Sequence, residues 1–271
     1  MPELPEVETT RRALERRVAG LAIRAVAQHR ADLRFALPAA LPSRLEGRRV
    51  EALRRRAKYI LADLDDGHTV ILHLGMSGRL VFDGPALGAH EHLTIDFADG
   101  TTLRLHDPRR FGMVDLQPTA GLAQHAWFRH LGLEPLAADF DGERLADVLA
   151  GRTNALKVAL MDQRVVVGIG NIYASEALHR AKLSPRRRAG WLKPAQSARL
   201  AWAVREVLEE AIEAGGSSLR DYVQASGELG NFQRNFRVYD RAGEPCACGR
   251  GTVRRIVQVG RASFYCPACQ R

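Results

Sequence analysis

The sequence predicts an α+β protein in which a β-rich first part is followed by a helical part and a short β-hairpin. Between about residues 22 and 116, short β-favouring runs alternate with turn signals. Helical periodicity replaces them after about residue 133, and all four cysteines bracket one last pair of strands. A chain of 271 residues is long enough to form two domains, each with its own core.

The first element is expected to be a helix, because Val7, Leu14 and Val18 share one helical face and Pro5 suits a first turn. Strands are expected after it wherever β-favouring residues lie between turn signals such as Asp99-Gly100. The clearest are Tyr59–Leu64, Thr69–Leu74, Leu93–Phe97 and Thr101–Leu105. This pattern is typical of an antiparallel sandwich or barrel.

The second half is predicted to be helical and to end in a hairpin. Its longest helix covers residues 194–214, with Leu200, Val204 and Leu208 on its apolar side and two glycines at its end. The polar, glycine-bearing residues that follow are expected to include a mobile loop. We expect domains at 1–134, 135–235 and 236–271, with the hairpin strands at 253–259 and 262–266 and a turn at Gly260-Arg261.

Charge is the most informative bulk property. The net charge of +9 and the pI of about 9.9 favour a polyanionic partner, either nucleic acid or an anionic membrane surface. No apolar run reaches the roughly 18 residues that span a bilayer. The acidic start MPELPEVETT lacks the features of a secretion signal, so we expect a cytoplasmic protein with reduced thiols.

The cysteines predict a metal site. Cys246 and Cys248 precede the predicted hairpin, and Cys266 and Cys269 follow it. A hairpin would bring four thiolates around one tetrahedral Zn²⁺ ion, and metal binding would supply much of the folding free energy of so small a module. In a reducing compartment a zinc site is favoured over disulfides or free thiols. The first pair is C-x-C, a tighter spacing than C-x-x-C.

Two glycine-bearing loops could present side chains to DNA. Met76 lies between glycines in HLGMSG, and Arg109 and Phe111 lie in DPRRFG. A cation and apolar wedges of this kind could fill the gap left by an extruded base. Taken singly, a Met or a Phe is more often a core residue, and that alternative stays open.

Two further turns could bind phosphate. The run VVVGIGNIY ends an apolar segment at two glycines and at Asn171, which would cap the next helix. Arg261, beside Gly260 at the hairpin tip, could reach a phosphate beyond the module. An ordinary glycine turn and an arginine that faces water are the alternatives.

The N-terminus offers a nucleophile. Removal of Met1 would leave Pro2 with a secondary amine, which can attack a sugar carbon and form an iminium. The reference pKa of about 8 leaves part of this amine neutral at pH 7, and the helix dipole would lower the pKa further. Glu3 could shuttle protons. The alternative is a helix start in which neither residue reacts.

Taken together, several segments resemble the bacterial formamidopyrimidine-DNA glycosylase family from the first residue to the last. They are MPELPEVET, RRAKY, HLGMSG, DPRRFG, VVGIGNIYASE and the cysteine hairpin with GRASFYC. The resemblance implies an N-terminal antiparallel β-sandwich with flanking helices, then a helical helix-two-turn-helix domain with a C-terminal zinc-finger β-hairpin. It also implies one structural Zn²⁺ per chain, damaged double-stranded DNA as partner, no membrane, and a monomer at the nucleoid.

The resemblance further implies roles for individual residues. The implied catalytic residues are the nucleophile Pro2, the acids Glu3 and Glu6, Lys58, and Arg261, which also contacts phosphate. Met76, Arg109 and Phe111 would occupy the place of the extruded base, with Arg109 facing the opposite cytosine. The remaining implied DNA contacts are His73, His92, Arg110, Lys157 and Asn171, and residues 217–232 would close over the flipped base.

The activity implied is excision of oxidised purines, such as 8-oxoguanine and formamidopyrimidines, followed by β,δ-elimination in base excision repair. The endonuclease VIII type prefers oxidised pyrimidines, but usually starts PEGPE where this chain reads PELPE. Two other classes stay open. A non-catalytic zinc protein that binds nucleic acid would leave Pro2, Glu3 and Lys58 idle, and an N-terminal-proline tautomerase would leave the cysteine hairpin and the two-domain length unexplained.

Overall fold

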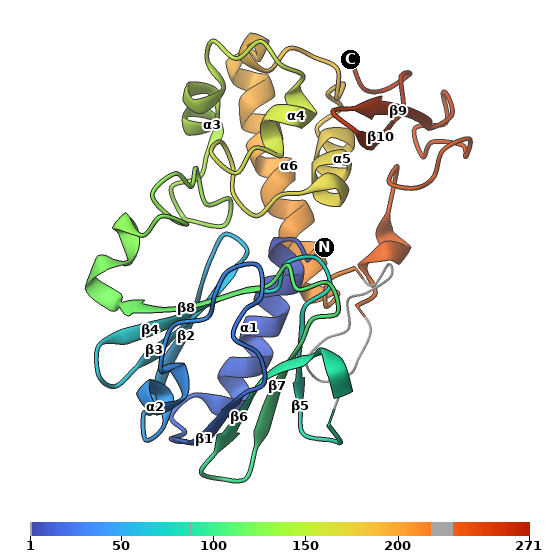
Figure 1. Ribbon diagram of the computed structural model, residues 1–271. Coiled ribbons are helices and arrows are strands. Elements are labelled where there is room, and N and C mark those ends of the chain that lie inside the picture. The colour runs from blue at the N-terminus through green and yellow to red at the C-terminus, as the bar shows by residue number, and fades with distance from the viewer. Residues whose placement is uncertain (1, 87, 218–229) are drawn as a thin grey trace. The chain divides into compact units, whose positions relative to one another are not determined.

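The computed structural model describes residues 2–86, 88–217 and 230–271, which form two compact units (Figure 1). Unit 1 contains the chain up to Arg129 together with the short stretches 214–217 and 230–231, and unit 2 contains His130–Glu213 and Phe232–Arg271. Antiparallel sheets and helices both contribute, which confirms the α+β class. The division into three domains stays a prediction.

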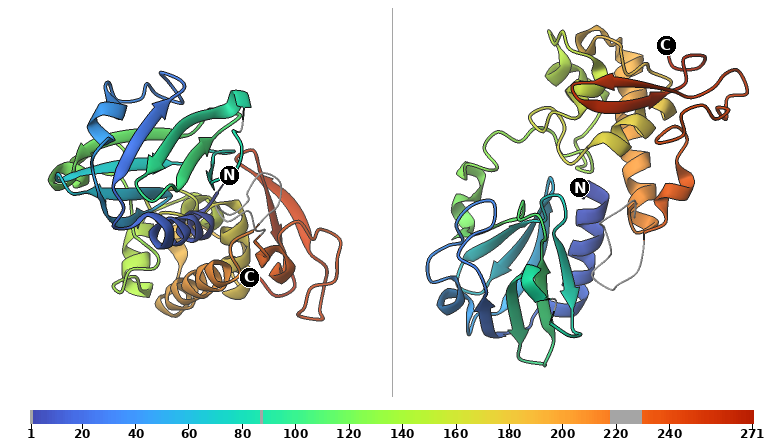
Figure 2. Two further views of the ribbon diagram at one scale, coloured as in Figure 1. Left: turned by 90° about the horizontal axis from the view of Figure 1, so that it is seen from below. Right: turned by 45° about the vertical axis from the view of Figure 1, so that its right-hand side comes forward.

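Unit 1 is built around two four-stranded antiparallel sheets (Figure 2). The first has the order β1 (Ile23–Gln28), β6 (Glu91–Phe97), β7 (Thr102–His106), β5 (Arg79–Phe82). The second has the order β2 (Val50–Arg56), β3 (Tyr59–Leu64), β4 (His68–His73), β8 (Met113–Pro118). One core cluster joins apolar side chains of both sheets, so the unit is a sandwich rather than a barrel.

Helix α1 (Leu4–Val18) packs against β2 and β3. The three residues predicted to share its inner face, Val7, Leu14 and Val18, are all buried, which confirms the helix. Arg11 also donates from Nη1 to the carbonyl oxygen of Leu53 in β2 at 3.0 Å. The short helix α2 (Leu41–Leu45) and two 3-10 turns, η1 (Gly88–His90) and η2 (Thr119–Gln124), complete the elements of this unit.

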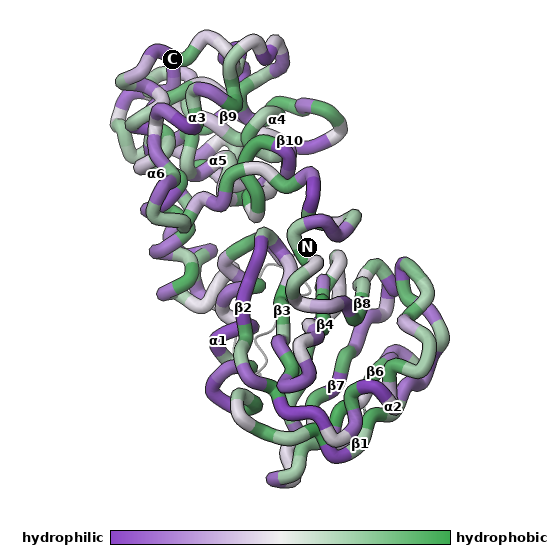
Figure 3. Tube along the Cα trace, turned by 90° about the vertical axis from the view of Figure 1, so that its left-hand side faces the viewer, coloured by the Kyte–Doolittle hydropathy of each residue, from purple (hydrophilic) through white to green (hydrophobic). Residues whose placement is uncertain are grey.

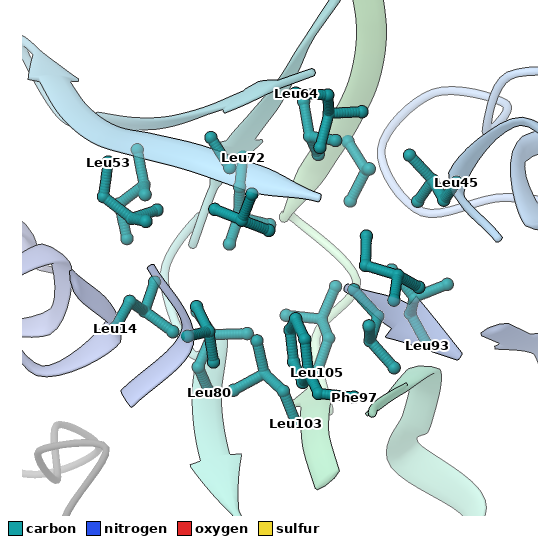
Figure 4. A pocket seen from close by; sticks show the side chains of 18 residues that line it. Leu14, Leu45, Leu53, Leu64, Leu72, Leu80, Leu93, Phe97, Leu103 and Leu105 are labelled. Carbon is teal, nitrogen blue, oxygen red and sulfur yellow. The ribbon is translucent and has the colours of Figure 1, made fainter. Parts of the chain in front are cut away.

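An apolar cavity of about 70 Å³ lies in the core of the sandwich (Figure 4). Side chains from both sheets and from α1 line it, among them Leu14, Leu80 and Leu105. Among the residues that the structure describes, no polar side chain lines this cavity, so a water molecule inside it would find no hydrogen-bond partner there. The two sheets therefore meet through dispersion contacts that are incomplete at this point.

Unit 2 is helical and carries the terminal hairpin. Its helices are α3 (Gly142–Leu149), α4 (Leu156–Leu160), α5 (Asn171–Arg180) and α6 (Pro194–Glu213), with 3-10 turns η3 (Ala189–Trp191) and η4 (Phe232–Asn235). Polar and apolar residues alternate along α6 (Figure 3), and its predicted inner residues Leu200, Val204 and Leu208 are buried against α3 and α5. The predicted long helix is confirmed.

The hairpin consists of β9 (Arg254–Gln258) and β10 (Arg261–Tyr265). Its tip differs from the expected turn at Gly260-Arg261. Val259 and Gly260 have φ values of 48° and 72°, which makes them the central pair of the turn, and Arg261 is already the first residue of β10, opposite Gln258. The predicted mobile loop falls mostly on residues 218–229, outside the described residues. None of the helices described is long and apolar enough to cross a membrane.

Replacing Leu105 by Ala should destabilise unit 1 by about 3 kcal/mol, because it removes buried methyl groups beside an existing cavity. Urea denaturation followed by circular dichroism measures the loss. Val81→Ala is the matched control, since Val81 is only half-buried in β5 and does not line the cavity; we expect less than about 1 kcal/mol. Equal losses for the two variants would show that the cavity does not weaken the core.

Candidate functional site

The start of the chain is held inside unit 1. Pro2 and Glu3 stand directly before α1, and both are buried, Glu3 with 4 % of its surface exposed. The carboxylate of Glu6 accepts the N–H of Glu3 at 2.8 Å on one oxygen and the N–H of Ser217 at 2.8 Å on the other. Glu6 thus fixes the first turn of the helix, whose positive end faces Pro2.

Lys58 and His73 are brought together by the second sheet. Lys58 follows β2 and is buried. The next residue, Tyr59, is paired with His73 across β3 and β4, and the centres of their two rings lie 4.8 Å apart. Burial, the charge of Lys58 and the charge of Arg34 lower the pKa of His73 to about 4. The N–H of Gly75 donates to Nδ1 of His73 at 3.0 Å, so neutral His73 carries its proton on Nε2.

A buried carboxylate joins the two loops that were predicted to carry DNA wedges. Asp107 is fully buried and accepts the hydroxyl of Ser77 at 2.7 Å and the N–H of Gly112 at 2.7 Å. The hydroxyl of Ser77 in turn accepts the N–H of Arg109 at 3.2 Å. No local pattern in the sequence marks Ser77 or Asp107 as functional, because their contact joins two loops 30 residues apart in sequence.

The wedge residues come together on this double loop. Met76 and Phe111 are exposed by 36 % and 40 %, and the guanidinium of Arg109 lies 5.1 Å from the centre of the Phe111 ring. The loops touch so closely that a Cβ on Gly75, which has φ +63°, would lie 2.4 Å from the carbonyl carbon of Phe111. Neither Met76 nor Phe111 is a core residue, so the alternative left open by the sequence is wrong for both.

Two of the predicted DNA contacts in unit 1 differ in exposure. Arg110 is exposed beside Arg109, in a left-handed conformation with φ 56°. His92 is 1 % exposed, and its Nε2 lies 2.8 Å from the carbonyl oxygen of Asp107. The direct DNA contact expected of His92 stays a prediction, and the structure adds a contact between His92 and the loop that presents Arg109.

In unit 2, a buried lysine links three elements. Lys157 of α4 is 1 % exposed, and its ammonium donates to Asn171 Oδ1 at 2.5 Å, to the carbonyl oxygen of Ala262 at 2.9 Å and to Ser263 Oγ at 2.8 Å. All three N–H groups are therefore engaged within the protein. The lesion contact expected of Lys157 likewise stays a prediction.

The lysine also changes the role of Asn171. Asn171 was expected to cap α5, but Gly170 is the N-cap and Asn171 is the first helical residue. Its side-chain oxygen accepts from Lys157 instead, which fixes the amide so that its NH₂ group points away from the lysine. Arg261 and Lys157 both line one cleft of about 200 Å³ between α4 and the hairpin. Lys157, Asn171 and the tip of the hairpin therefore form one connected site.

The four cysteines fit a tetrahedral metal ion. Their sulfur atoms lie within 4.8 Å of one another, with Cys246 and Cys269 at 3.9 Å and Cys248 and Cys266 at 3.8 Å. Metal–sulfur bonds of about 2.3 Å at tetrahedral angles place sulfurs about 3.8 Å apart, whereas a disulfide needs about 2 Å. The C-x-C spacing is thus compatible with a four-thiolate metal site.

Helix α5 connects this metal site to the helical core. Glu176 accepts the N–H groups of Arg237, Val238 and Tyr239 at 2.9, 3.0 and 2.8 Å, and burial raises the pKa of its carboxyl. One turn later, Nε2 of His179 lies 3.3 Å from Sγ of Cys246. Neither residue was predicted from the sequence, where their i, i+3 spacing on one helix face is the only signal.

Comparison with known proteins relates both parts of the chain to one family of DNA glycosylases. The family described as the formamidopyrimidine-DNA glycosylase N-terminal domain matches residues 1–114, and that described as the formamidopyrimidine-DNA glycosylase H2TH domain matches residues 131–223. Formamidopyrimidine-DNA glycosylases of Beijerinckia indica and Cereibacter sphaeroides are each 53 % identical over the whole of both chains.

Solved structures of similar proteins superpose on this chain over nearly its full length. The MutM (Fpg) protein of Thermus thermophilus superposes with a TM-score of 0.88 at 42 % identity, covering 99 % of this chain and 98 % of that one. The Lactococcus lactis Fpg bound to DNA with an abasic site superposes with a TM-score of 0.90 at 33 % identity, covering 99 % of each chain. The chain therefore belongs to the formamidopyrimidine-DNA glycosylase family.

Proposed function

We propose that this DNA glycosylase excises oxidised purines from duplex DNA through a Schiff base on Pro2 and then cleaves the strand by β,δ-elimination. The observation that carries the proposal is the placement of Pro2 and Glu3 in front of α1, where Glu6 anchors the helix start. Relatives named formamidopyrimidine-DNA glycosylase, 53 % identical over the full length of this chain and of their own, support the proposal. Because DNA is the substrate, the protein would act at the chromosome.

The chemistry follows from an amine at the end of the chain. Once Met1 is removed, the lone pair of the Pro2 nitrogen attacks C1′ of the damaged nucleotide, and the bond from C1′ to the base breaks with its electron pair on the base. Glu3, next to Pro2 in the chain, would donate the proton that opens the sugar ring. The resulting iminium accepts the electrons released when the C2′ proton is removed, so the 3′ phosphate can leave.

Extruding a base leaves a gap that the double loop fits. Extrusion costs a few kcal/mol, and side chains that occupy the gap offset that cost. Met76, Phe111 and Arg109 are grouped and exposed at one place, and Arg109 offers hydrogen-bond donors to the widowed base. The rigid link through Asp107 keeps these residues in place before DNA arrives.

Phosphate contacts are proposed for groups in both units. His73 offers an Nε2–H donor, and in unit 2 Asn171 offers an amide whose orientation Lys157 fixes. Arg261 offers a guanidinium at the start of β10. We further propose that Lys157 positions Asn171 and the hairpin. His92 would support the backbone at Asp107.

We also propose that the metal is Zn²⁺, one per chain. Four thiolates at tetrahedral spacing suit Zn²⁺, and the small cluster of Val238, Val253 and Phe264 around them is a modest core for a stable module. Zinc would stabilise the base of the hairpin that presents Arg261. Its part is structural, since all four ligands come from the protein and leave no open position.

Borohydride reduction during incubation with an 8-oxoguanine:cytosine duplex should trap a covalent protein–DNA adduct through Pro2. Mass spectrometry of the tryptic N-terminal peptide locates the cross-link. A variant with an extra residue fused before Pro2 serves as the control and should form no adduct, because its nitrogen is then an amide. An adduct that survives in the blocked protein would identify another nucleophile and contradict the mechanism.

DNA binding through His73 should not depend on pH between 6 and 8. With a pKa of about 4, His73 stays neutral over this range, so acidification adds no charge at the phosphate. The affinity ratio of wild type to His73→Gln for a duplex with an abasic-site analogue, measured by fluorescence anisotropy at constant salt, should stay constant. A ratio that rises steadily toward pH 6 would show that His73 becomes protonated on the DNA.

The metal site should hold one zinc per chain by elemental analysis, and His179→Phe should release it faster. The hydrogen bond from His179 stabilises the negative charge on Cys246, and outer-shell partners of this kind change metal affinity by about 10- to 100-fold. Zinc release to a chromogenic chelator measures the effect, with His130→Phe, at an exposed position distant in sequence from the cysteines, as control. Equal zinc release rates for His179→Phe and wild type would show that His179 does not stabilise the metal site.

A further inference from the structure

The turn that carries Lys58 contains a residue in a conformation that its side chain disfavours. Ala57 connects β2 to β3 with φ 54° and is 1 % exposed. In this left-handed region the Cβ of an L-residue crowds its own backbone, which is why glycine is the usual occupant. Something must therefore hold the turn in this shape.

Arg55 makes the contact that does so. Its Nη1 donates to the carbonyl oxygen of Ala57 at 3.0 Å, and its Nε donates to Oε2 of Glu8 at 3.1 Å. The side chains of Arg55 and Glu8 are only 9 % and 11 % exposed. One guanidinium thus connects the turn of Lys58 to α1, the helix that begins at Pro2 and Glu3.

Glu8 is itself fixed by the helix and by the sheet. It accepts from Nη2 of Arg11 at 3.0 Å and from Nε of Arg12 at 2.9 Å. Arg11 also donates to the carbonyl oxygen of Leu53 in β2 at 3.0 Å. The carboxylate therefore has little freedom to follow Arg55 if the turn moves.

The same contacts argue against a DNA-binding role for the side chain of Arg55. The basic run at residues 54–56 looks in sequence like a DNA-binding patch. Arg54, however, forms a bidentate pair with Asp63 at 2.5 and 2.7 Å, and Arg55 is buried on Glu8. The charge of both side chains is thus paired within unit 1.

We propose that Arg55 is a positioning residue, which clamps Ala57 in its left-handed conformation and so holds Lys58 at a fixed place relative to the helix of Pro2. The inference rests on the proposed roles of Pro2 and Lys58. Small displacements of a group from its reactive geometry can lower a rate by up to about 100-fold without weakening binding. The clamp is therefore expected to affect the rate of the chemical step.

The test combines removal of the clamp with removal of the strain. Arg55→Met should lower the single-turnover rate of base excision and of borohydride trapping by about tenfold, with the DNA concentration at half-maximal rate within about twofold of wild type. Adding Ala57→Gly should restore most of the rate, because glycine adopts φ 54° without the clamp. Arg55→Lys is a second variant, for use if Arg55→Met folds poorly. It retains the charge but cannot bridge both acceptors, so its single-turnover rate should fall as well.

A matched control separates the turn from a general effect of glycine. Ala40 also has a left-handed φ of 57°, at the start of α2, so Ala40→Gly in the Arg55→Met background should restore nothing. Rescue by Ala57→Gly alone supports the clamp. Wild-type rates in both Arg55 variants, or a loss that Ala57→Gly does not repair, would overturn it. Absence of trapping in the wild-type protein would instead overturn the proposed function, and the clamp with it.

Discussion

A chain terminus is normally the least ordered part of a protein, but in this protein Pro2 and Glu3 are buried. The carboxylate of Glu6 orders this segment, because it accepts the N–H of Glu3 on one oxygen and that of Ser217 on the other. The start of the chain and Ser217, which is 211 residues from Glu6, are thereby tied to the first turn of α1. Any role for the amine of Pro2 depends on this anchor.

The same logic recurs at the loops of the sandwich. Met76 and Phe111 are exposed and Lys58 is buried, but all three lie on turns whose backbone is held by buried polar groups. Asp107 holds the loops of Met76 and Phe111 together, and Arg55 holds the turn of Lys58. These interior groups are paired, so they can hold the three turns in place without burying an unpaired charge.

Unit 2 uses a buried cation and a metal site for the same purpose. Lys157 joins α4, the start of α5 and strand β10 through three hydrogen bonds, and the four cysteines close the base of the hairpin. Glu176 and His179 fasten this module to α5 from one helix face. A hairpin of two five-residue strands thereby receives the rigidity that its own small core could not give.

The sequence by itself determined the α+β class, the long α6, the strand β3 to the residue, and the residues that carry reactive or charged groups. Local periodicity, turn chemistry and cysteine spacing encode these features, and each acts over a few neighbouring residues. The tertiary structure alone decided that His92 and Lys157 lie inside while Met76 and Phe111 lie outside. It also decided that Asp107, Glu176 and Arg55 are the supports, because a buried polar residue is defined by partners that the sequence places far away.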